Sequence, residues 1–131
     1  MIGLDTNILV RYLTQDDPVQ SKRASELIER RLTEENPGFV SIVAMVETVC
    51  VLDRSYGFAA REIVAAVERL LQIDVLIIEN EQEVFKAMTV LKDGKASFAD
   101  AVIAELGLRA GCTRTLTFDH KAARLPEFEL I

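Results

Sequence analysis

The sequence predicts a three-layer α/β/α sandwich with a mostly parallel central sheet flanked by helices. Short apolar runs typical of strands alternate with longer segments of helical periodicity along the 131 residues. Half of the residues are hydrophobic, which is enough for a core and argues against disorder. No repeat, linker or low-complexity tract interrupts the alternation. We therefore expect a single domain over residues 1–131.

The first elements follow from apolar spacing and capping residues. Met1–Leu4 is a short apolar run that predicts a strand ending at Asp5. A helix follows, because apolar residues recur at helical spacing at Ile8, Leu9, Tyr12 and Leu13. Asp17 and Pro18 mark the next helix start as N-cap and first helical residue. Its apolar stripe is Ala24, Leu27, Ile28 and Leu32, and the breaker at residues 36–38 ends it.

The middle of the chain repeats the alternation. Phe39–Ser41 predicts a brief buried strand, and Ser41 can cap a helix that runs to Tyr56. The helix after it has one apolar face, made of Ile63, Val64, Val67, Leu70 and Leu71. Val75–Ile78 is a Leu- and β-branched-rich run between acidic ends, which predicts an interior strand.

Two helices and two strands complete the chain. The helices are predicted over Glu81–Lys92 and Phe98–Ala110, separated by a breaker at residues 93 and 94. Thr115–Phe118 predicts a strand that ends at Asp119, followed by one helical turn and a final strand over Phe128–Ile131. This pattern does not give the order of the strands in the sheet.

Composition excludes several classes of protein. The formal charge of −6 excludes a protein that coats polyphosphate through general basicity. One histidine and two cysteines cannot build the common four-ligand zinc sites. Cys50 and Cys112 stand apart among small or apolar neighbours, so we expect buried thiols in a reducing compartment. No stretch approaches the roughly 20 apolar residues of a membrane span, and we expect a cytoplasmic protein.

Known motifs for other chemistries are also missing. The chain has no P-loop and no dinucleotide fingerprint. A Ser-His-Asp or Cys-His site would need His120, which lies in a polar turn. The segment from Asp5 to Asn7 lacks the second Asp of an aspartyl-phosphate phosphatase motif.

Two carboxylates follow predicted strands. Asp5 ends the first strand and Asp119 ends the strand over Thr115–Phe118. Ligands of open α/β sheets bind outside the carboxyl ends of strands, so both side chains should face the expected site. The alternative is that each residue simply caps the helix that follows it.

Two further carboxylates lie on predicted helices. Glu47 is the only charged residue between Phe39 and Leu52, on a helix that is apolar on nearly all sides and is therefore predicted to be buried. An unpaired buried carboxylate is costly, which favours a catalytic or metal-binding role over a buried ion pair or an edge position. Asp100 lies three residues after Ser97, the capping-box spacing, although Asp is short for that role.

Taken together, the four carboxylates can lie along one edge of a parallel sheet. Two carboxylates about 4 Å apart repel by roughly 4 kcal/mol at an effective dielectric near 20. Such a cluster requires protons or a hard cation, and oxygen ligands without histidine suit Mg²⁺ or Mn²⁺. Mg²⁺ sites are often completed by substrate phosphate, so the pattern indicates metal-assisted phosphoryl transfer or hydrolysis.

These motifs resemble the signature of PIN-domain nucleases, specifically the VapC-type toxins of type II toxin–antitoxin systems. The matching segments occur in family order over the whole chain: residues 2–9, the helix around Glu47, residues 98–101, and residues 116–119 with 122–125. The resemblance implies an endoribonuclease whose catalytic and metal-holding residues are Asp5, Glu47, Asp100 and Asp119. Thr6, Asn7 and Thr117 match its supporting polar positions, and His120 occupies a position that is often basic in the family. The resemblance also implies a homodimer and a cognate antitoxin that blocks the site.

An RNA substrate requires basic groups beside the acidic site. The candidates are Arg11, Lys22, Arg23, Lys121 and Arg124, although each could equally be an ordinary solvated side chain. The eight aromatic residues are scattered, so the sequence predicts no base-stacking platform. Two alternatives stay open: a non-catalytic binding module with carboxylate caps, and an Mg²⁺-dependent phosphohydrolase of small substrates.

Overall fold

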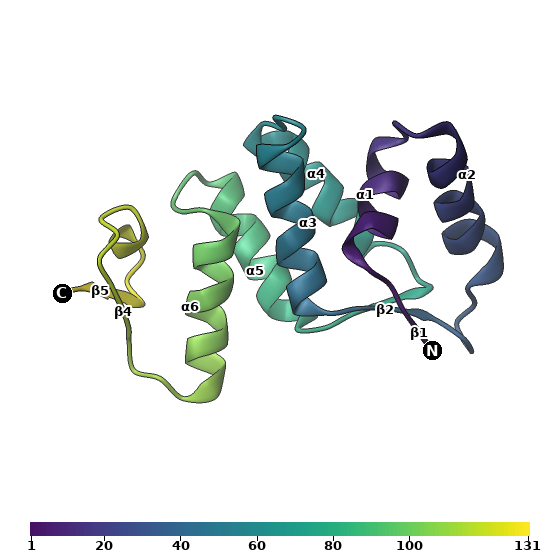
Figure 1. The fold of residues 1–131 in the computed structure, drawn as a ribbon. Coiled ribbons are helices and arrows are strands. Elements are labelled where there is room, and N and C mark those ends of the chain that lie inside the picture. The colour runs from purple at the N-terminus through teal and green to yellow at the C-terminus, as the bar shows by residue number, and fades with distance from the viewer. The chain divides into compact units, whose positions relative to one another are not determined.

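The computed structural model describes residues 1–131, which divide into two compact units, Met1–Asn80 and Glu81–Ile131. The first unit runs from purple to teal in Figure 1 and the second from teal-green to yellow. The first unit contains β1 (Ile2–Gly3), α1 (Thr6–Thr14), α2 (Pro18–Glu26), the π-helical turn η1 (Leu27–Arg31), β2 (Gly38–Val40), α3 (Ile42–Arg54), α4 (Ala60–Leu71) and β3 (Leu76–Ile78). The second contains α5 (Glu81–Lys92), α6 (Phe98–Ala110), β4 (Thr115–Thr117), the 3₁₀ turn η2 (Ala122–Arg124) and β5 (Phe128–Leu130).

The first unit is built on a parallel three-stranded sheet with the order β1-β2-β3. Gly38 lies at its centre, paired with Ile2 on one side and Leu76 on the other. A Cβ atom at this glycine would lie 2.9 Å from the Cδ atoms of both Leu32 and Leu76, so a side chain here would force these leucine ends to shift. The core around the sheet includes the completely buried side chains of Leu9, Val40, Met45 and Leu52.

The position of β3 corrects one prediction. Val75–Ile78 was predicted to be an interior strand, but β3 lies at the edge of its sheet and β2 is central. Leu76 and Ile78 are buried, whereas Ile77 between them is 46% exposed. The strand therefore buries one face only, and a continuous apolar run does not distinguish this arrangement from burial on both faces.

Capping signals gave the starts of α2 and α3 correctly. Asp17 accepts hydrogen bonds from the backbone N–H groups of Val19 and Gln20, and Pro18 is the first helical residue of α2. The Ser41 hydroxyl oxygen accepts from the Ala44 N–H and begins α3. Local hydrogen bonds of this kind depend only on neighbouring residues, so the sequence alone predicts them.

The second unit contains an antiparallel helix pair and a two-stranded sheet. Helices α5 and α6 lie side by side in Figure 1 and have the predicted bounds, with Gly94 in the left-handed region at φ 70° between them. Arg109 near the end of α6 donates a hydrogen bond of 2.6 Å to the buried Glu83 near the start of α5. This hydrogen bond lowers the pKa of Glu83. Strands β4 and β5 are parallel, with Thr115 opposite Phe128.

The cysteine prediction was partly wrong. Both thiols are free, but Cys112 is exposed and Cys50 is only half-buried. Cys112 follows the left-handed Gly111 that ends α6, and a residue in such a turn has few neighbours to cover it. None of the helices is both long enough and apolar enough to cross a bilayer.

Candidate active site

Asp5 connects β1 to α1. The Leu4 N–H donates to the Phe39 carbonyl oxygen at 2.9 Å, so strand pairing continues to the residue before Asp5. The exposed Asp5 side chain accepts a hydrogen bond of 2.7 Å from the Thr6 N–H at the N-terminus of α1. An N-cap side chain usually bonds to N–H groups one or two residues further along the helix. One oxygen therefore makes a short local bond, and the second has no protein donor.

Glu47 lies on α3, and its surroundings correct a prediction. The helix was predicted to be buried on nearly all sides, but it buries one face, formed by Ala44, Met45, Thr48, Val49 and Leu52. Glu47 is exposed and so is Val43, at 71%, one turn earlier on the same side of the helix. Glu47 makes no hydrogen bond or ion pair, so the structure gives it no structural role. The cost of burying a charge therefore no longer argues for its function.

Asp100 lies in the first turn of α6 and half of the predicted capping box is present. The Ser97 hydroxyl oxygen accepts from the Asp100 N–H at 3.1 Å, but the Asp100 carboxylate makes no return bond to Ser97. The return bond is made where a Glu is available: the Glu62 carboxylate accepts from the Ala59 N–H at 2.9 Å at the start of α4, where Ala59 has no side-chain oxygen for the other half of the box. The shorter Asp100 side chain is consequently left half-buried and without a protein partner.

Asp119 lies in the turn after β4. Its N–H donates to the Thr117 hydroxyl oxygen at 2.9 Å, and its carboxylate accepts from the Lys121 N–H at 2.8 Å. Thr117 therefore holds the turn, as a supporting residue would. The side chain of Asp119 is exposed and one of its oxygens has no protein donor.

The four carboxylates are divided between the two units. Asp5 and Glu47 belong to the first unit, and Asp100 and Asp119 belong to the second. No group of three or more His, Cys, Asp or Glu side chains is placed to hold a metal ion. The convergence of the four carboxylates therefore stays a prediction from the sequence. What the structure does establish is that none of the four is in a salt bridge.

Comparison with known families decides the kind of protein. The family description "PIN domain" matches residues 2–127, a span that covers both units and all four carboxylates. The chain belongs to the PIN-domain family. A comparison with curated proteins found no match. The α/β class with parallel strands is thereby confirmed, consistent with the three-layer fold of PIN domains. PIN domains are generally metal-dependent nucleases that act on nucleic acids.

The donor set of this PIN domain suits the divalent metals that the family typically uses, Mg²⁺ and Mn²⁺. These are hard cations that prefer carboxylate oxygen and water as ligands. Asp5, Glu47, Asp100 and Asp119 together offer such oxygens, and no arginine or lysine neutralises any of them. The chemistry of the residues therefore fits the group.

One carboxylate that the sequence analysis did not single out supports the Glu47 helix. The Glu79 side chain, which follows β3, accepts a hydrogen bond of 2.8 Å from the Ile42 N–H at the start of α3. A carboxylate here is favoured by the positive end of the helix dipole. The partners are 37 residues apart, so no local pattern could have revealed the contact.

The predicted basic residues are divided between the two units. Arg11 and Arg23 line a groove between α1 and α2, whereas Lys22 lines a different pocket on α2. Lys121 and Arg124 are exposed in the second unit and take part in no ion pair. Arg11 is committed to the protein itself, because it is paired with Asp16 at 3.1 Å.

Asp16 is the centre of a polar network that holds Arg11. The Tyr56 hydroxyl donates to Asp16 at 2.7 Å, and the Thr14 hydroxyl donates at 2.8 Å. These bonds, with Arg11 as a further contributor, lower the pKa of Asp16 from 3.8 to about 2. A lowered carboxyl pKa means that the network stabilises the folded chain above pH 4 and that this contribution is lost as the pH falls toward 2.

Tyr56→Phe is expected to raise the pKa of Asp16 toward its ordinary value, because the Tyr56 hydroxyl is the main cause of the shift. The mutant should also lose stability at a higher pH than the native chain during acid titration. Carboxyl chemical shifts followed by NMR, together with acid unfolding curves, measure both effects. Phe58→Leu is the control, because it changes a neighbouring aromatic ring without touching Asp16. An unchanged Asp16 titration in Tyr56→Phe would contradict the assignment.

Proposed function

We propose that this PIN domain is an Mg²⁺- or Mn²⁺-dependent endoribonuclease that hydrolyses RNA phosphodiester bonds. The proposal rests on four carboxylate side chains, two that follow strands and two that lie on helices. None has an ion-pair partner, and the family match spans all of them. The residues proposed to hold the metal and to act in catalysis are Asp5, Glu47, Asp100 and Asp119.

The residues of the chain have distinct tasks in this proposal. A bound divalent ion would neutralise phosphate charge and lower the pKa of a water molecule. One of the four carboxylates accepts the proton that the attacking water gives up. The Thr6 N–H fixes the orientation of the Asp5 carboxylate, and the Thr117 hydroxyl fixes the turn that carries Asp119. Asn7 is exposed in the first turn of α1, where it can assist Asp5 or contact substrate.

We further propose that the nuclease is a VapC-type toxin of the cytoplasm, a homodimer that is blocked by a cognate antitoxin. The order of the four motifs along the chain and the family match over residues 2–127 support this assignment. A gene for a small DNA-binding protein immediately upstream would be expected. Growth arrest on induction that is relieved by co-expression of that protein would test the toxin role directly.

The metal requirement has a direct test. We expect Mg²⁺ or Mn²⁺ to raise the melting temperature of the protein and EDTA to reverse the shift, because a ligand that binds only the folded state stabilises it. Metal-dependent cleavage should be seen with single-stranded or structured RNA and not with a generic phosphatase substrate. Cleavage of no RNA under any divalent metal would contradict the proposal. Hydrolysis of the small substrate alone would indicate a different phosphohydrolase.

The structure also offers grounds for a non-catalytic binding module. Asp5 and Asp119 each accept one local backbone hydrogen bond, as purely structural caps would. That alternative predicts no thermal shift with Mg²⁺, so the same melting experiment separates the two functions. It leaves the unpartnered Glu47 and Asp100 without a role, which is why we favour the nuclease.

A further inference from the structure

Helices α1 and α2 and the turn η1 enclose a groove of about 340 Å³ in the first unit. We call it the arginine groove. It is lined by Asn7, Ile8, Arg11, Gln20, Arg23, Ala24, Leu27 and Arg31. No carboxylate lines it, although the unit contains thirteen acidic and eight basic residues. The charged residues that line the groove are therefore all basic, whereas the unit as a whole is acidic.

The three arginines are not equivalent. Arg11 donates to Gln20 and to Asp16, so it is fixed in place and its charge is neutralised. Arg23 and Arg31 are exposed and form no ion pair or side-chain hydrogen bond. They lie eight residues apart along α2 and η1, about 12 Å at helical rise. Two free guanidinium groups at that separation can reach different phosphates of one strand.

The groove also has an apolar part and a defined position along the chain. Ile8 and Leu27 are half-buried and contribute carbon surface to the lining of the groove. An unstacked base can lie on such a surface and stack against a guanidinium plane. Asn7 lines the same groove two residues after Asp5, so the groove begins beside the strand end that carries the proposed site. Its volume is at the lower end of the range for ligand pockets, which suits part of a single strand rather than a duplex.

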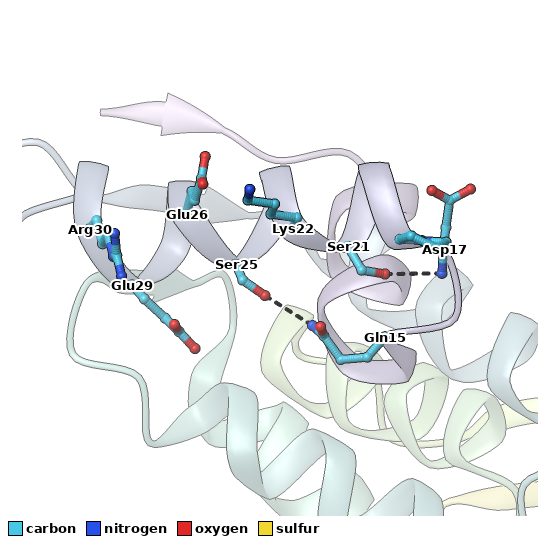
Figure 2. Close-up of a pocket in the computed structure, with 9 residues that line it drawn as sticks. Gln15, Asp17, Ser21, Lys22, Ser25, Glu26, Glu29 and Arg30 are labelled. Carbon is cyan, nitrogen blue, oxygen red and sulfur yellow. Dashed lines mark hydrogen bonds between the residues drawn. The ribbon is translucent and has the colours of Figure 1, made fainter.

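A neighbouring pocket on the same helix provides a contrast. That pocket, of about 520 Å³, lies where Lys22 and Arg30 share the surface with Asp17, Glu26 and Glu29. Figure 2 shows these side chains together with the hydrogen bond between Gln15 and Ser25. Three carboxylates against two basic groups make this pocket unsuitable for a polyanion. Lys22 and Arg23 are adjacent in sequence, yet only Arg23 belongs to the arginine groove.

We propose that the arginine groove binds single-stranded RNA, with Arg23 and Arg31 on backbone phosphates and the apolar part under a base. The inference rests on the proposed nuclease function and adds the path of the substrate on the first unit. Arg31 is a substrate-binding residue that the motifs did not indicate. Arg11 shapes the wall of the groove through Gln20 and does not hold a phosphate.

The test compares two double variants of one helix. Arg23→Gln/Arg31→Gln removes the free charges of the groove, and Lys22→Gln/Arg30→Gln removes two charges from the other pocket. Both change the net charge by the same amount. Binding to a fluorescently labelled single-stranded RNA is measured by anisotropy in EDTA, where the metal-dependent reaction cannot proceed. We expect the groove variant to bind at least about 10-fold more weakly, with a salt slope lower by about 1.4 for two lost phosphate contacts. The control variant should bind within about 2-fold of the native chain.

Several outcomes would overturn the proposal. Equal losses in both variants would indicate general charge attraction, and no loss in either would exclude the groove. A third outcome is that poly-glutamate binds in the groove while the groove variant binds RNA as well as the native chain does. This result would assign the groove to an acidic protein partner. Melting temperatures of both variants confirm that they are folded.

Failure of this inference is distinguishable from failure of the nuclease function. If RNA binds through the groove but is never cleaved with Mg²⁺ or Mn²⁺, the proposed nuclease function is wrong and the RNA-binding role of the groove stands. If the native chain cleaves RNA with metal and the groove variant binds RNA normally, the nuclease function stands and the role of the groove is wrong.

Discussion

Asp100→Asn is expected to reduce metal-dependent RNA cleavage by about 100-fold or more, the scale on which a well-placed catalytic group contributes. The melting temperature in EDTA should be unchanged or higher. Asn keeps the size of the side chain and the backbone N–H that donates to Ser97, so α6 still begins normally. Only the negative charge is lost. If that charge sits among other carboxylates, its removal also relieves repulsion.

Ser97→Ala is the matched control for this substitution. It removes the hydroxyl that caps α6 and should cost about 1 kcal/mol of stability while leaving cleavage intact. Initial cleavage rates and melting curves with and without Mg²⁺ separate the two variants. The metal-induced thermal shift should shrink in Asp100→Asn and persist in Ser97→Ala. An unfolded Asp100→Asn protein, or one with full activity, would show that Asp100 is structural.

The helices were largely predictable because their signals are local. Helices α5 and α6 have the predicted bounds, with a glycine between them in the left-handed region. Asp17 with Pro18 and Ser41 were recognised as helix starts, and the structure shows the corresponding hydrogen bonds. Each signal lies within a few residues of the bond that it predicts, so no long-range information was needed.

The strands and the site depend on residues distant in sequence. That β3 lies at a sheet edge follows from which strand pairs with which, and an apolar run does not encode its partner. The cap that Glu79 provides to α3 joins partners 37 residues apart. Whether the four carboxylates come together also depends on contacts between residues that are distant in sequence. Family motifs in order predict it, whereas local geometry shows only that none of the four side chains is in an ion pair.

The burial argument for Glu47 was wrong, although the residue stays a candidate through the family motif. The apolar composition of α3 predicted burial all round, and the cost of a buried charge was the argument for function. The helix instead exposes Val43 and Glu47 and buries the opposite face. Composition counts apolar residues but does not say which face they cover, and Val residues occur on both faces here. The family motif, not burial, now supports Glu47.

Leu52→Ala on α3 is expected to lower the free energy of unfolding by about 2 to 5 kcal/mol. Leu52 is completely buried, so truncation leaves a cavity beneath the helix that carries Glu47. Typical domains are stable by about 5 to 15 kcal/mol, so the loss is a large share of the total. Urea unfolding measures it, and an unchanged slope would show that the midpoint shift reflects stability.

Two other substitutions on the same helix separate stability from function. Val43→Ala changes a side chain that is 71% exposed and should alter stability by no more than about 0.5 kcal/mol. Glu47→Gln should abolish cleavage. Its stability should equal that of the native chain, because the carboxylate has no hydrogen-bond or ion-pair partner to lose. A Val43→Ala cost as large as that of Leu52→Ala would mean that the outer face of α3 is covered in solution. Loss of stability in Glu47→Gln would mean that the carboxylate is structural, and the proposed metal-holding set would then lose this member.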